Sequence, residues 1–118
     1  MQLKITGDEK IYWTQHSKGK MRYWGLSQKR VKRVLKNHDR KDLGIAPNTV
    51  AIMEIVGTKK RPTEIWVMYQ KTPKSPKTKQ RTIKIISAWR YPGRSPKGQP
   101  PPIPEDTLWE LEKSKNEN

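Results

Sequence analysis

The segment from residue 12 to residue 37 constrains the fold more than any other part of the chain, because it holds two helical patterns separated by one glycine turn. Thr14 and Ser17 are both suited to cap a first helix, since their hydroxyls can accept a bond from a backbone N–H of the first turn. That helix is predicted to run to about Trp24. Gly25 is predicted to end it, because glycine readily takes the left-handed conformation found after helices.

The second helix is predicted over residues 28–36, with Ser27 as its N-cap and Asn37 as its C-cap. The apolar residues in and just before this helix have helical spacing and predict one buried face: Leu26, Val31, Val34 and Leu35. The other face is basic: Lys29, Arg30, Lys32, Arg33 and Lys36. No acidic residue lies between Ser27 and Asn37, so we expect a nucleic-acid surface here, although solvated helix faces also carry such charge runs.

Three later segments have the composition of strands, over residues 48–56, 64–70 and 82–89, and residues 2–6 suggest a further edge strand. The expected fold is therefore α+β, with two N-terminal helices packed on a three- to four-stranded antiparallel sheet. In the last strand, alternation predicts one face with Ile83 and Ile85 and the other with Lys84, Ile86 and Ala88.

A chain of 118 residues fits one domain, which we place at residues 1–91. Residues 92–118 are expected to form a Pro-rich extended tail that ends in a short helix over residues 105–112. Leu108 and Trp109 are the expected anchors of that helix. Only 31% of the residues are hydrophobic and there is no Phe, so the core must use aliphatic residues and tryptophan.

Several functional classes lack the residues that they need. The absence of cysteine excludes disulfides and cysteine-bound metal sites, and two histidines argue against a structural metal, so no cofactor is expected. No apolar run approaches the roughly 20 residues of a membrane span, and no signal peptide pattern follows Met1. These features predict a cytoplasmic protein that does not enter a membrane.

The charge of the chain is strongly positive and unevenly distributed. Residues 1–50 carry twelve basic and four acidic groups, for +8, and residues 51–99 carry twelve and two, for +10. Residues 100–118 carry two and five, for −3, which brings the total to +15. A basic body with an acidic end favours binding of a polyanion, of which RNA is the one that we expect.

Two motifs give the chain a family resemblance. The first is H-x3-K-M-x3-G-L-S-x2-R-V-x2-V-L-x-N over residues 16–37, and the second is I-I-S-A-W-R over residues 85–90. Over residues 12–91 the chain resembles a small domain of unknown function grouped with the RelE/ParE-like toxins. Lys20 departs from the pattern, because arginine is commoner there, and lysine keeps the charge but loses bidentate geometry.

The resemblance implies a metal-independent ribonuclease toxin that cleaves RNA by attack of the 2′-hydroxyl. His16 would be its acid/base, and Lys20 and Arg90 would bind the scissile phosphate, with Tyr91 beside them. Arg22, Tyr23 and the basic helix face would bind RNA, and Tyr23 or Tyr91 would stack on a base. The expected partners are RNA, in free or ribosome-associated form, and an acidic antitoxin protein.

Other interpretations stay open at this stage. The same scaffold suits a non-catalytic nucleic-acid-binding or accessory protein of mobile-element origin, or a ParE-like protein that inhibits an enzyme by contact. His16 can equally be a helical histidine bonded to a nearby carbonyl. Arg90 can instead pair with Glu54 or Glu64, and the two tyrosines can simply cover the core.

Overall fold

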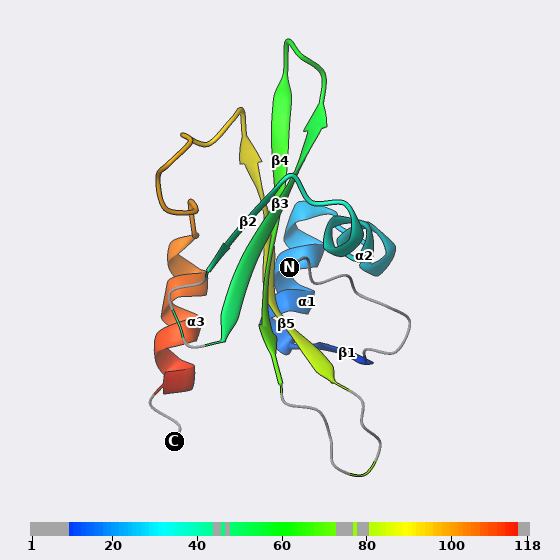
Figure 1. Cartoon of the computed structure of the whole chain (residues 1–118), viewed down its shortest axis with the longest axis vertical. Coiled ribbons are helices and arrows are strands. Elements are labelled where there is room, and N and C mark those ends of the chain that lie inside the picture. The colour runs from blue at the N-terminus through cyan, green and yellow to red at the C-terminus, as the bar shows by residue number, and fades with distance from the viewer. Residues whose placement is uncertain (1–9, 44–45, 47, 73–76, 78–80, 116–118) are drawn as a thin grey trace.

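The computed structural model describes residues 10–43, 46, 48–72, 77 and 81–115, which form an α+β fold (Figure 1). Its elements follow in the order β1 (Lys10–Trp13), α1 (Gln15–Trp24), α2 (Gln28–Lys36), β2 (Arg40–Leu43), β3 (Thr49–Gly57), β4 (Pro62–Lys71), β5 (Thr82–Pro92) and α3 (Glu105–Lys115). The edge strand expected over residues 2–6 and most of the loop after β4 lie outside the described residues.

The sheet has five strands in the order β1-β5-β4-β3-β2 and is mixed, because β1 runs parallel to β5 while the other pairs are antiparallel. The expected antiparallel sheet of three or four strands was therefore too small and wrong in one pairing. The two strands that were missed, β1 and β2, are four residues each, with alternating burial. Strands this short give little periodic signal in a sequence.

Helices α1 and α2 begin and end where their capping residues predict. The Thr14 hydroxyl accepts a bond from the Ser17 N–H at 3.1 Å, and the Ser27 hydroxyl accepts one from the Arg30 N–H at 3.0 Å. Gly25 follows α1 with a φ of 68°, in the left-handed region that favours glycine. The short turn that results places both helices on the same face of the sheet, which we call the first face (Figure 1).

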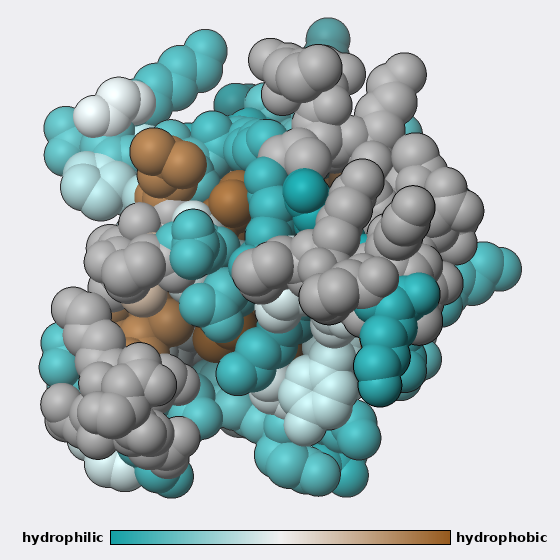
Figure 2. Space-filling view, turned by 60° about the horizontal axis from the view of Figure 1, so that its bottom comes forward, coloured by the Kyte–Doolittle hydropathy of each residue, from teal (hydrophilic) through white to brown (hydrophobic). Residues whose placement is uncertain are grey.

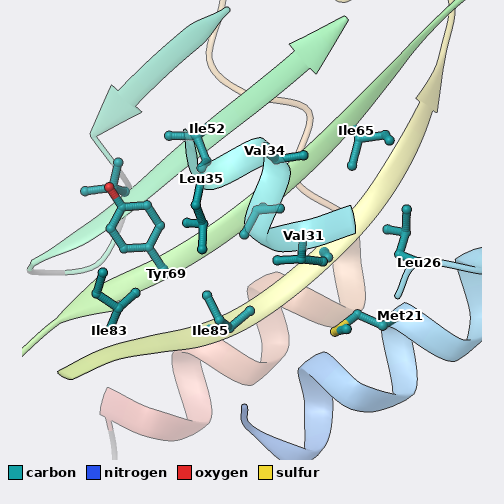
Figure 3. Close-up of a cluster of buried hydrophobic side chains, with 13 residues drawn as sticks. Met21, Leu26, Val31, Val34, Leu35, Ile52, Ile65, Tyr69, Ile83 and Ile85 are labelled. Carbon is teal, nitrogen blue, oxygen red and sulfur yellow. The ribbon is translucent and has the colours of Figure 1, made fainter. Parts of the chain in front are cut away.

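The main core lies between these two helices and the first face (Figure 3). It contains Met21, Leu26, Val31, Val34, Leu35, Val50, Ile52, Ile65, Val67, Tyr69, Ile83, Ile85 and Ala88. The apolar stripe of α2 supplies three of them, because residues three and four apart share one side of a helix.

The opposite, second face of the sheet is covered by residues 93–104 and α3 (Figure 1). Trp66 and Trp89 stack there with ring centroids 6.1 Å apart, and Leu111 of α3 packs against their cluster. The segment expected as a Pro-rich extended tail is therefore not a tail, although the expected short helix is present as α3. Its expected anchors were also wrong, since Leu108 is 37% and Trp109 67% exposed while Leu111 is buried.

A buried carboxylate ties residues 93–99 to the second face. Glu64 is fully buried and accepts bonds from the Trp66 indole N–H at 2.9 Å and the Ser95 backbone N–H at 3.0 Å. The Arg40 guanidinium lies 5.2 Å from the Trp66 ring centroid and donates to the Gln99 carbonyl. A buried carboxylate needs such donors, because an unpaired charge is very costly to bury.

A β-bulge in β5 changes which residues face each core. Met68 pairs with Ser87 and Tyr69 with Ile85, so Ile86 is an extra residue in the ladder. Ala88 consequently lies in the first-face core with Ile85, and Ile86 lies in the second. The expected placement of Ala88 beside Ile86 was wrong for this reason. None of the described helices has both the length and the apolar character needed to cross a bilayer.

Candidate functional site

The candidate site is an open cavity of about 580 Å³ on α1, close to the start of α3. It is lined by Gln15, His16, Gly19, Lys20, Tyr23, Trp24 and Asp106. His16, Lys20 and Tyr23 come together as their spacing predicts, because residues four and seven apart share a helix face. Gly19 has no side chain, and the space beside it is open, since a Cβ built there meets nothing within 4 Å.

Both ends of α1 are hydrogen-bonded to strand β5, so the helix that lines the cavity is joined to the sheet. The Thr14 hydroxyl donates to the Ile85 carbonyl at 2.8 Å, where the pairing of β1 with β5 ends. At the other end, Arg90 Nε donates to the Trp24 carbonyl at 2.9 Å. The Ile85 carbonyl also accepts the Thr14 backbone N–H at 3.3 Å. The Trp24 carbonyl belongs to the last turn of α1, where carbonyls lack a partner within the helix.

Arg90, expected either to bind the scissile phosphate or to pair with a carboxylate, lies beside the end of α1. It does not line the cavity, and its described hydrogen bond goes to the end of α1. The alternative pairing with Glu54 or Glu64 is wrong, because Glu54 pairs with Arg30 and Glu64 with Arg94 at 3.8 Å.

His16 is bonded to a residue that lies 91 positions away in the chain. Its Nε2 is 3.3 Å from Thr107 Oγ1, and Thr107 Oγ1 is 2.8 Å from Ser87 Oγ. Thr107 and Ser87 are fully buried between α3 and β5. A hydroxyl both donates and accepts, so Thr107 can hold the imidazole ring in either of its protonation states.

Lys20 carries the positive charge of the cavity and is held by Asp106. Its Nζ lies 3.0 Å and 3.2 Å from the two carboxylate oxygens. The lysine side chain is only 13% exposed, whereas that of Asp106 is 52% exposed. The lysine is thus largely enclosed, and its bound anion faces solvent.

Two aromatic rings border the cavity: Tyr23, which is exposed, and Trp24, which is partly buried. Tyr23 is 77% exposed and lies edge-on to Trp24, with centroids 5.0 Å apart. An exposed ring beside a cation is suited to stack on a nucleobase. Tyr91 is partly buried and packs against the second-face cluster, and the exposed Arg22 does not line the cavity.

The basic face of α2 is partly neutralised by a residue from the sheet. Arg30 lies 2.7 Å and Arg33 3.6 Å from the Glu54 carboxylate on β3. The sequence showed no acid within α2, and the pairing arises only when β3 packs beneath the helix. Lys29, Lys32 and Lys36 stay exposed, and none joins an ion pair with the described residues.

On the lower face of the molecule, the residues that are not drawn in grey are mostly hydrophilic, and hydrophobic ones show only in small areas (Figure 2). Among the described residues, no three His, Asp or Glu side chains are grouped closely enough to hold a metal ion.

Comparison with protein-family models, with curated proteins and with solved structures finds no match to this chain.

Proposed function

We propose that this chain is an RNA-binding protein on a RelE/ParE-like scaffold, and that the cavity on α1 is a metal-independent ribonuclease centre. The observation that carries the proposal is the convergence of His16, Lys20 and Tyr23 on one open cavity. An imidazole, a cation and an exposed aromatic ring supply proton transfer, phosphate binding and base stacking.

In the proposed reaction the ribose 2′-oxygen attacks the neighbouring phosphorus and the P–O5′ bond breaks. The products are a 2′,3′-cyclic phosphate and a 5′-hydroxyl. His16 transfers a proton at the 2′-hydroxyl or at the leaving 5′-oxygen, and water takes part in the other transfer. Lys20 binds the phosphate, while Tyr23 stacks on an adjacent base.

Arg90 and Tyr91 have supporting roles in this proposal. Arg90 positions the end of α1 through the Trp24 carbonyl, and Tyr91 covers the core beside it. Arg22 and the exposed lysines of α2 would extend the RNA path beyond the cavity. As a toxin, such a protein would act on free or ribosome-associated RNA and would be neutralised by an acidic antitoxin.

The direct test is RNA cleavage by the wild type, His16→Ala and His38→Ala, with and without EDTA. His38 is the only other histidine, so its variant is a matched control prepared in the same way. We expect EDTA-resistant cleavage that leaves cyclic phosphate ends, that persists in His38→Ala and that falls by about 10²–10⁴-fold in His16→Ala. Equal cleavage by all three proteins would indicate a contaminating nuclease and would refute the catalytic proposal.

A second candidate is a non-catalytic nucleic-acid-binding or accessory protein on the same scaffold. The observation in its favour is that Lys20 is the only lysine or arginine among the described residues that line the cavity, while Arg90 is bonded to the end of α1. In that case His16→Ala would leave RNA affinity unchanged and no cleavage would occur, while loss of the α2 lysines would weaken binding.

A further inference from the structure

The start of α3 lies directly on the candidate site. Asp106 lines the cavity and binds the Lys20 ammonium through both oxygens, at 3.0 Å and 3.2 Å. The next residue, Thr107, bonds to His16. Two consecutive residues of α3 therefore contact two of the three α1 residues on which the proposed function depends.

A carboxylate on a lysine occupies the position that a phosphate oxygen would take, because both are anionic oxygens that accept from the ammonium group. The Lys20 side chain is 13% exposed, so an incoming anion has little room to bind it while Asp106 stays in place. RNA and α3 should consequently compete for the same group.

Helix α3 is attached through two buried side chains, Leu111 and Thr107, and Asp106 itself lies at the exposed start of the helix. Leu111 is the only buried apolar side chain among those described in the helix, while Leu108 and Trp109 are exposed. The main core on the first face includes no α3 residue, so moving α3 leaves that core intact. The segment before the helix has its own attachment through Ser95 and Glu64.

We propose that α3 is an autoinhibitory lid, in which Asp106 occupies on Lys20 the site of an RNA phosphate. This proposal depends on the proposed RNA-binding function of the cavity. An RNA phosphate reaches Lys20 only when Asp106 leaves it, so the apparent affinity of the cavity in the wild type is lowered by the fraction of molecules in which the lid is closed.

Acidic residues at the start of a helix have another role, which the test must separate from a lid. Glu105 and Asp106 both lie in the first turn of α3, where the helix dipole favours negative charge. Glu105 does not line the cavity. Glu105→Gln and Asp106→Asn therefore remove the same charge from the same turn, and only the second frees Lys20.

The experiment measures binding of a single-stranded 2′-O-methyl RNA, which lacks the attacking hydroxyl and so is not cleaved. Fluorescence anisotropy at about 50 mM salt would give Kd for the full-length wild type, Glu105→Gln and Asp106→Asn, each with and without Lys20→Gln. We expect Asp106→Asn to bind about two- to fivefold more tightly than Glu105→Gln. Lys20→Gln should abolish that difference.

Each other outcome overturns a specific step. Equal affinity of Asp106→Asn and Glu105→Gln, with Lys20→Gln still weakening binding, would refute the lid and leave the RNA site standing. If Lys20→Gln changes no affinity, or no variant binds RNA, the cavity is not an RNA site and both proposals fail. Circular dichroism and thermal melts would confirm that the variants are folded.

Discussion

At the scale of single residues, Thr107 links helix α3 to His16 of α1 and Ser87 of β5. Its hydroxyl is fully buried, lies 2.8 Å from Ser87 Oγ and 3.3 Å from His16 Nε2, and so belongs both to the packing of α3 and to the candidate site. A buried hydroxyl that loses its partner has a desolvation cost that the intact pair avoids.

Replacing Thr107 should separate these two roles. Thr107→Val removes the hydroxyl at nearly constant volume and leaves the buried Ser87 Oγ without this partner, so we expect a loss of about 1–3 kcal/mol in unfolding free energy. Thr107→Ser keeps the hydroxyl and is the control. Urea unfolding measures the stability, and ¹⁵N NMR of the His16 ring should shift in Thr107→Val only. Equal stability of the two variants would contradict the described hydrogen bonds.

Tyr69 predicts how stability depends on pH at the alkaline end. Burial raises its pKa above the ordinary value of 10.0, because the phenolate is poorly solvated in the core. The stability that the neutral ring contributes is therefore fully present below about pH 10 and is lost as the pH rises through the higher folded-state value.

Tyr69→Phe cannot ionise and should lose less unfolding free energy than the wild type as the pH rises above about 10. The difference has an upper limit of about 1.4 kcal/mol per pH unit in that range. Tyr12→Phe, at a position 57% exposed, is the control and should behave like the wild type. Lysines titrate in the same range in all three proteins, so only the difference between variants is informative. Parallel pH profiles for Tyr69→Phe and the wild type would refute the prediction.

At the scale of elements, the sequence predicted the boundaries of helices α1 and α2, because capping by adjacent residues determines them. The capping hydroxyls of Thr14 and Ser27 and the left-handed Gly25 are properties of a few adjacent residues, and both helices lie where those residues indicate. The three long strands, β3, β4 and β5, also lie close to the expected ranges, because their apolar runs are long. Strand β2, with the sequence RKDL, is polar and four residues long, and only its pairing with β3 makes it a strand.

The part of the candidate site that lies within α1 was predictable from the sequence, and the part contributed by α3 was not. His16, Lys20 and Tyr23 follow from helical spacing, which is a local property. Asp106 and Thr107 join them only through the path of the chain across the second face, 86 and 91 residues further on. No spacing rule connects residues that far apart, and the same reason hid the pairing of Glu54 with α2.

Two glycines in different elements should respond oppositely to alanine. Gly57 has a φ of 88°, and a Cβ there would lie 2.5 Å from the Arg61 carbonyl oxygen, so Gly57→Ala should cost about 1–3 kcal/mol in unfolding free energy. Gly19 lies inside α1 with open space beside it, so Gly19→Ala should stabilise by about 0.5–1 kcal/mol. Chemical denaturation of both variants measures the two signs, and destabilisation by Gly19→Ala would show that its cavity face is more crowded than described.

At the scale of the whole molecule, the net charge of +15 favours attraction of a polyanion such as RNA. The pKa of Lys71 is lowered by desolvation and then by the charges of Lys41 and Arg81. Positive groups are thus close enough to repel one another even outside the candidate site. A protein of this charge attracts RNA at many basic positions of its surface, so affinity alone cannot locate the interface.

The salt dependence of RNA binding can locate the interface, because each phosphate contact adds about 0.7 to the slope of log affinity against log salt for a single strand. The variant Lys29→Gln, Lys32→Gln, Lys36→Gln removes the exposed lysines of α2 and should lower that slope by about 2. The control variant Lys10→Gln, Lys97→Gln, Lys113→Gln makes the same change in net charge at exposed positions outside α2 and outside the cavity lining.

The two triple variants should therefore differ in slope, although both carry three charges fewer than the wild type. Fluorescence anisotropy with the 2′-O-methyl RNA between about 50 and 200 mM salt measures both slopes. If RNA follows α2, the control slope stays near that of the wild type, because released counterions report the contacts formed and not the total charge. If both variants lose the same slope, RNA is held by net charge alone, and α2 is not a specific part of the interface.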